Sequence, residues 1–96
     1  MSLNEYLRGT LEQYIDEGRQ SVPSMIQVYR AHATRELVKT MENYIFEFIQ
    51  GWILAQFVST YRSLYFQLPS PDIQKAVGTI IFRRSREIRN AIFSQG

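Results

Sequence analysis

One histidine is the only side chain in this sequence whose charge changes near neutral pH. Glu36 follows His32 at a distance of four residues, so a helix would place the two side chains on one face. One imidazole and one carboxylate are too few ligands for a metal, and the HExxH spacing of zinc proteases is absent. Because the chain has no cysteine, thiolate zinc sites and cysteine nucleophiles are excluded as well. We therefore expect no metal site and an ordinary surface or boundary histidine.

Glu47 is the acid with the most apolar sequence surroundings, since it lies within Tyr-Ile-Phe-Glu-Phe-Ile. Burial without a partner would raise the pKa of its carboxyl, as happens in catalytic acids. No second carboxylate is placed beside it, and the chain lacks a phosphate-binding lysine loop, GxGxxG and GxSxG. We expect Glu47 to lie at the rim of the core or to pair with Arg84. The sequence predicts no catalytic residue, no cofactor and no enzyme.

The densest charge cluster is Arg83-Arg84-Ser85-Arg86, with Arg89 one turn further on. Such a cluster is either a solvated helix face or a surface that binds phosphates and releases their counterions. Arg84 falls where the apolar stripe of its helix requires an apolar residue, so we expect it to pair with an acid or to lay its stem along the core. Arg83, Arg86 and Arg89 are the candidate contacts for nucleic acid, which is the alternative function that the sequence suggests.

Charge is distributed unevenly along the chain. Residues 1–22 carry two more acids than bases, whereas residues 69–96 carry three more bases than acids. The two segments can attract each other within one fold or between subunits, or leave the protein with one basic face.

Apolar residues at helical spacing and strong helix-boundary signals define the two ends of the fold. The first stripe predicts a helix over 3–17, with Gly18 as its C-cap. At the other end, Ser70 caps a helix whose first position is Pro71 and which ends near Phe93. The first stripe consists of Leu3, Leu7, Leu11 and Ile15.

Between Pro23 and Leu68 the sequence has no strong helix breaker, and one apolar register runs through it. This stretch forms either one helix of about 45 residues or two helices, 23–50 and 52–68, separated near Gly51. Because average helices are far shorter, we favour a break or kink at Gly51. The sequence therefore predicts an all-α bundle of three to four helices, with a long aromatic-rich central helix and a single domain over 1–96.

Aromatic residues are concentrated in this central stretch, where eight of the chain's thirteen lie between Tyr44 and Phe66. A helix that is apolar on every side needs cover on every side, and two flanking helices of one chain supply too little. The remainder becomes an exposed apolar patch of the kind that marks association sites. We expect a non-catalytic interaction or assembly protein that pairs with itself, as a homodimer or higher oligomer. The expected interface residues are Tyr44, Phe48, Trp52, Ala55, Tyr61 and Tyr65.

A third possibility is a pocket for an apolar ligand, formed by Phe48, Trp52 and Phe57. The longest uncharged run, 48–61, has 14 residues and is shorter than the roughly 20 residues of a membrane span. The first residues also lack the basic and apolar regions of a secretory signal. We therefore expect no membrane span and a cytoplasmic location.

Overall fold

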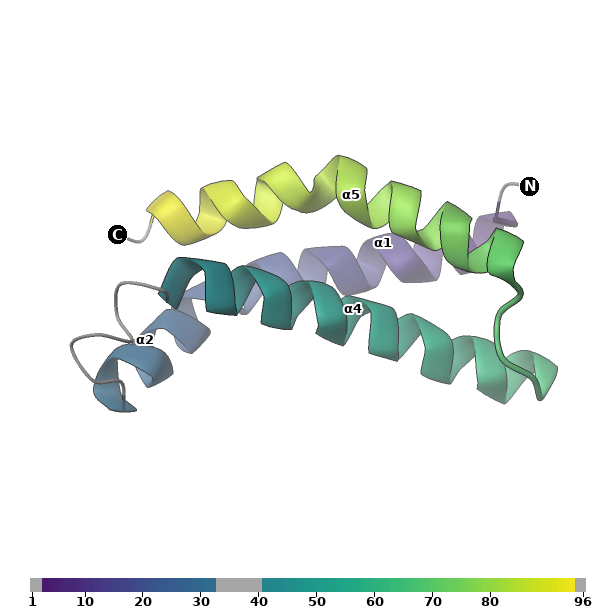
Figure 1. Cartoon of the computed structure of the whole chain (residues 1–96), viewed down its shortest axis with the longest axis horizontal. Helices are drawn as coiled ribbons and strands as arrows, with labels where there is room; N and C mark the ends of the chain where they lie inside the picture. The colour runs from purple at the N-terminus through teal and green to yellow at the C-terminus, as the bar shows by residue number, and fades with distance from the viewer. Residues whose placement is uncertain (1–2, 33–40, 95–96) are drawn as a thin grey trace.

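The computed structural model describes residues 3–32 and 41–94, which form α-helices and short connections (Figure 1). Within these residues there is no strand, so the all-α prediction is confirmed. The helices are α1 (Glu5–Gln20), α2 (Val22–His32), α4 (Met41–Tyr65) and α5 (Pro71–Ser94).

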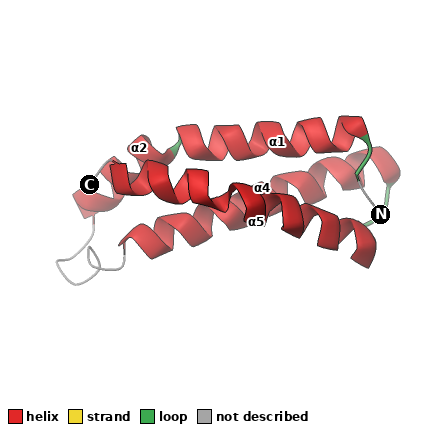
Figure 2. Ribbon diagram, turned by 90° about the horizontal axis from the view of Figure 1, so that it is seen from above, coloured by secondary structure: helices red, strands yellow, loops and turns green. Residues whose placement is uncertain are grey.

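Three long helices, α1, α4 and α5, pack against one another in pairs. Helices α1 and α5 run in the same direction and α4 runs opposite to both (Figure 1). The shorter α2 lies at one end of this bundle and contacts all three long helices (Figure 2). Each long helix therefore has two long neighbours and one side that faces away from the bundle.

Side-chain caps begin two of the helices. The side chain of Asn4 caps α1, because its Oδ1 accepts a hydrogen bond of 2.8 Å from the backbone N–H of Leu7. Ser70 caps α5 as expected, with its Oγ accepting from the N–H of Ile73 at 3.3 Å. Helix α5 ends at Ser94, one residue beyond the predicted end at Phe93.

The prediction that Gly18 ends the first helix is wrong. Helix α1 continues to Gln20, and Gly18 is buried where α1 meets α4. A Cβ atom at this position would lie 2.8 Å from Cγ2 of Ile49 and 3.3 Å from Cδ1 of Ile53. Glycine is required here because the two helix backbones approach closely, not because the chain turns.

The expected break at Gly51 is not present, since α4 is one helix of 25 residues. A single glycine in a helix costs only about 1 kcal/mol relative to alanine, which packing on either side offsets. Neither expected range, 23–50 or 52–68, matches the observed helices, and residues 33–40 lie outside the described part of the chain. Helix α4 ends at Tyr65, and the left-handed φ of 58° at Phe66 follows it.

The buried side of α4 is mainly a row of isoleucines, which lies beside the row that contains most of the expected interface residues. The side chains of Ile45, Ile49 and Ile53 are at most 1% exposed, whereas Tyr44 and Phe48 are half exposed. Both rows step by three or four residues, so periodicity alone does not distinguish them. Compact isoleucines fit the narrow space beside Gly18, whereas aromatic rings would not. The buried stripe of α4 comprises Met41, Ile45, Ile49, Ile53, Phe57 and Tyr61.

Two glycines of α1 provide a test of the close approach to α4. Gly18→Ala should lower the free energy of unfolding by about 1–3 kcal/mol, because the new methyl group overpacks the contact with Ile49. Gly9→Ala, whose Cβ would meet no atom within 4 Å, should instead raise it by up to about 1 kcal/mol through helix propensity. Urea denaturation followed by circular dichroism measures both, and a stabilised Gly18→Ala variant would contradict the packing described.

Candidate interaction surfaces

Arg84 ties the first helix to the last. Its Nε and Nη2 donate to the two carboxylate oxygens of Glu87 at 2.7 and 2.9 Å, and Nη2 also donates to Asp16. Its Nη1 donates to the backbone carbonyl of Glu12 at 3.3 Å. The expectation that Arg84 pairs with an acid is confirmed, but the acids come from α1 and from its own helix. The alternative pairing with Glu47 is wrong.

These contacts shift the pKa values of both partners. The hydrogen bond from Arg84 lowers the pKa of Glu87, with the charge of Arg84 acting in the same direction against partial burial. The pKa of Arg84 is raised, chiefly by its hydrogen bond to Glu87. Arg19 adds a second cation, 3.7 Å from Glu87 and 3.9 Å from Asp16. The acidic start and the basic end of the chain therefore attract each other within one fold.

The side of α4 that faces away from the bundle is an apolar and aromatic surface. Tyr44 is 53% and Phe48 is 51% exposed, and Ala55 and Tyr65 are exposed too. Four of the six residues predicted for an interface therefore lie on the surface. We define the α4 outer face by the row Tyr44, Phe48, Gly51, Ala55, Val58 and Arg62.

The other two predicted interface residues stabilise the chain's own fold. Trp52 is partly buried and packs edge-on against Tyr14 of α1, with the ring centroids 6.2 Å apart. Tyr61 is only 8% exposed and lies in the core between the rings of Phe57 and Tyr65. The prediction that Tyr61 lies at an interface is therefore corrected, because almost none of its side chain is exposed.

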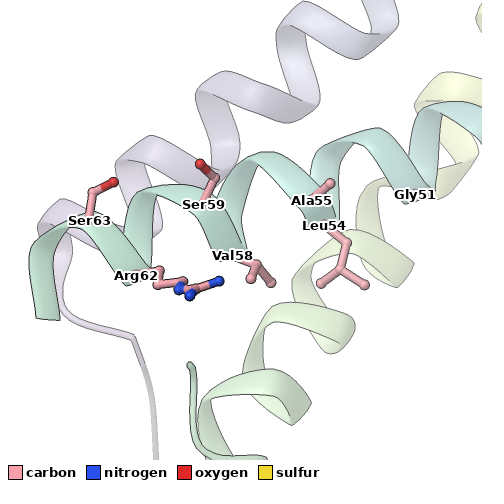
Figure 3. Close-up of a pocket in the computed structure, with 7 residues that line it drawn as sticks. All are labelled: Gly51, Leu54, Ala55, Val58, Ser59, Arg62 and Ser63. Carbon is pink, nitrogen blue, oxygen red and sulfur yellow. The ribbon is translucent and has the colours of Figure 1, made fainter. Parts of the chain in front are cut away.

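Two shallow hollows lie along α4 and share Gly51, Leu54 and Val58. One, of about 710 Å³, follows the helix to Arg62 and Ser63 (Figure 3). The other, of about 630 Å³, is a groove between α4 and α5. Leu54, which the interface prediction omitted, is 44% exposed and projects where the two hollows meet. The α4 outer face is thus bordered by apolar recesses.

The structure describes the position of Glu47, the acid singled out in the sequence, but not the side chain of the histidine. Glu47 is exposed at the edge of the groove between α4 and α5, which is the expected rim position. The side chain of His32, like the whole of Glu36, lies outside what the structure describes. Phe57 is 1% exposed and belongs to the core, so it does not join Phe48 in the proposed ligand pocket.

The side of α5 that faces away from the bundle combines cations with aromatic rings. We define the α5 outer face by Lys75, Phe82, Arg86, Arg89 and Phe93, all of them exposed. Phe82 is 79% and Phe93 is 54% exposed. Neither phenylalanine was predicted as a site residue. Both lie off the apolar stripe of this helix, and this position in the sequence indicates that they are exposed.

The three arginines predicted to contact nucleic acid are spread across α5. Arg86 lies in the middle of the α5 outer face. Arg83 lies at its α1 side, in a groove of about 400 Å³ that Arg8 and Lys75 also line. Arg89 lies at the α4 side, where its Cζ is 4.3 Å from the ring centroid of Phe46.

Comparison of the chain with protein families, with curated proteins and with solved structures finds no match. No helix in the described residues is long and apolar enough to cross a membrane. In the same part of the chain, no three acidic or histidine side chains come together as a metal-binding group.

The contact between Arg84 and Glu87 predicts how stability depends on pH. Because the pKa of Glu87 is lowered in the fold, its carboxylate stabilises the protein above its ordinary pKa, and this contribution is lost as the pH falls through the lowered value. The urea midpoint of the unchanged protein should fall below about pH 4, and Glu87→Gln should flatten that acid dependence. Glu5→Gln is the control, since Glu5 is exposed and makes no ion pair among the described residues. Equal acid slopes for the two variants would contradict the prediction.

Proposed function

We propose that this protein is a non-catalytic assembly module that pairs with a second copy of itself through the α4 outer face. The observation that carries the proposal is the exposure of Tyr44 and Phe48 in one row with an apolar hollow, on the side of α4 opposite its buried isoleucines. Exposed aromatic rings next to recesses are typical of association surfaces. A second copy supplies an identical row, which is the simplest way to cover such a face.

The spacing along the α4 outer face supports helix-to-helix pairing. Its residues follow one another at intervals of four, three, four, three and four, which is the heptad pattern of a two-helix seam. The row is also symmetric about residue 53. Reversing its direction places position 44 opposite 62, 48 opposite 58, and 51 opposite 55.

Charge favours the antiparallel direction. Glu47 borders the seam near one end and Arg62 is the last residue of the seam at the other end. Neither has an ion-pair partner among the described residues. Parallel pairing would bring like charges together at both ends. Antiparallel pairing brings Arg62 of each copy to the end of the other copy that carries Glu47 and the ring of Tyr44.

Side-chain size supports the same arrangement. Gly51 and Ala55 occupy the middle of the seam, where two crossing helices come closest. Among the described residues, a Cβ at Gly51 would meet no side chain and no other element within 4 Å. The larger Phe48 and Tyr44 lie further out, where crossing helices diverge. The Tyr44 ring is already held by Tyr29 at 5.3 Å, which reduces the entropy lost on association.

Phe48→Asp tests the proposed interface. The change should raise the dissociation constant of a dimer at least tenfold, because it places a charge in the apolar seam. Sedimentation equilibrium measures the association, and circular dichroism should show unchanged helix content. Phe48 is a better probe than Trp52, whose replacement by Asp would also remove the contact with Tyr14.

Phe66→Asp is the matched control, since Phe66 is 90% exposed and lies beyond the end of α4. It introduces the same charge and should leave association unchanged. A wild-type chain that sediments as a monomer at high micromolar concentration would refute the proposal.

Cysteine cross-linking tests the direction of pairing. Because the sequence has no natural cysteine, only the introduced cysteines can form a disulfide. In an antiparallel pair the two copies of position 44 are about 27 Å apart along the helix axis, whereas 44 lies opposite 62. Tyr44→Cys and Arg62→Cys should therefore form a disulfide-linked dimer under oxidation only when the two variants are mixed. Disulfide dimers of Tyr44→Cys alone would show parallel pairing and would contradict the antiparallel arrangement without removing self-association.

A further inference from the structure

The α5 outer face holds cations without an ion-pair partner, although Arg89 also lies against the ring of Phe46. Lys75, Arg86 and Arg89 on this face, and Arg83 at its border, have no ion-pair partner among the described residues. Helix α5 carries two acids, of which Glu87 is already bound to Arg84, and Asp72 lies at the start of the helix beside Lys75 only. In Figure 1, α5 forms the upper edge of the bundle and no described element lies above it. The face therefore presents uncompensated positive charge to a partner.

Two phenylalanines lie in line with these cations. Phe82 and Phe93 are eleven residues apart, which is three helical turns, so both rings project to the same side of α5. Arg86 and Arg89 lie between them. The order along the helix is Lys75, a ring, two arginines and a second ring, over a length of about 27 Å.

We infer that the α5 outer face is a binding site for single-stranded nucleic acid. Such ligands carry a row of phosphates, which Lys75, Arg86 and Arg89 can neutralise with release of counterions. They also carry unpaired bases, which can stack on exposed aromatic side chains such as Phe82 and Phe93. This surface lies on a different helix from the α4 outer face, so the inference does not depend on self-association.

Two other polyanions, an anionic membrane surface and duplex DNA, fit the same face less well. A membrane-surface helix requires a broad apolar stripe with cations at its flanks, and its affinity grows with buried apolar area. Here Arg86 and Arg89 interrupt the line between the two rings, which leaves only two separate apolar contacts. Duplex DNA offers phosphates but keeps its bases stacked, so it gives Phe82 and Phe93 no flat surface to bind.

Fluorescence anisotropy with a labelled mixed-sequence single-stranded DNA oligonucleotide tests the inference on the full chain. We expect binding that weakens steeply as salt increases, and tighter binding to the single strand than to the matching duplex. Phe82→Ala should weaken binding about tenfold through lost stacking, while leaving the slope of log K against log salt unchanged. Phe66→Ala, which removes an even more exposed ring outside this face, should have no effect.

Arg86→Gln separates charge from stacking. Loss of one phosphate contact should reduce the salt slope by about 0.7. Arg30→Gln is the matched control, because Arg30 is an exposed cation on α2 and is not part of this face. A change of the same size in both variants would mean that only net charge matters, and would overturn the assignment of the site to α5.

Three further outcomes would also overturn the inference. The first is no binding to the oligonucleotide at low salt. The second is equal or tighter binding to the duplex, with no effect of Phe82→Ala. The third is binding to vesicles that contain phosphatidylserine without binding to the oligonucleotide, which would identify the α5 outer face as a membrane-docking surface.

Discussion

The close approach of α1 and α4 at Gly18 determines which side of α4 is buried. Only compact side chains fit where the missing Cβ of Gly18 lets the helices meet, so Ile49 and Ile53 occupy this contact. Helix α4 is apolar on nearly every side, and burying the isoleucine side leaves the aromatic side outward. The exposed rings of Tyr44 and Phe48 are therefore a direct consequence of one backbone-to-side-chain contact.

Much of this fold follows from the sequence by local rules. The cap at Ser70, the start of α5 at Pro71 and the first apolar stripe are all decided within a few residues of one another. The sequence predicted a helix end at Gly18 and a break at Gly51, but both glycines lie inside helices. The role of each glycine depends on what packs opposite it. Gly18 faces two isoleucines and Gly51 faces open space, and no local pattern contains that information.

The candidate surfaces were predicted less completely than the fold, also for a physical reason. Two rows of apolar residues on α4 have equivalent spacing, and the choice between them rests on packing with α1. Trp52 and Tyr61 were therefore assigned outward although Tyr14 and Phe57 cover them in part. The pairing of Arg84 with an acid, in contrast, was predicted from the sequence, since a cation within an apolar stripe requires a partner. Asp16 and Glu87 are its partners.

The hydrogen bond between Arg84 and Asp16 joins residues 68 positions apart in the chain. During synthesis, α1 leaves the ribosome before α5 is complete, so until the last helix emerges Asp16 has only Arg19 of its own helix as a cation. Closing so long a loop is slow compared with forming a helix or a helical hairpin. The contact between Arg84 and Asp16 is thus expected to form late in folding. Until it forms, the growing chain exposes the apolar side of α1 that α5 later covers.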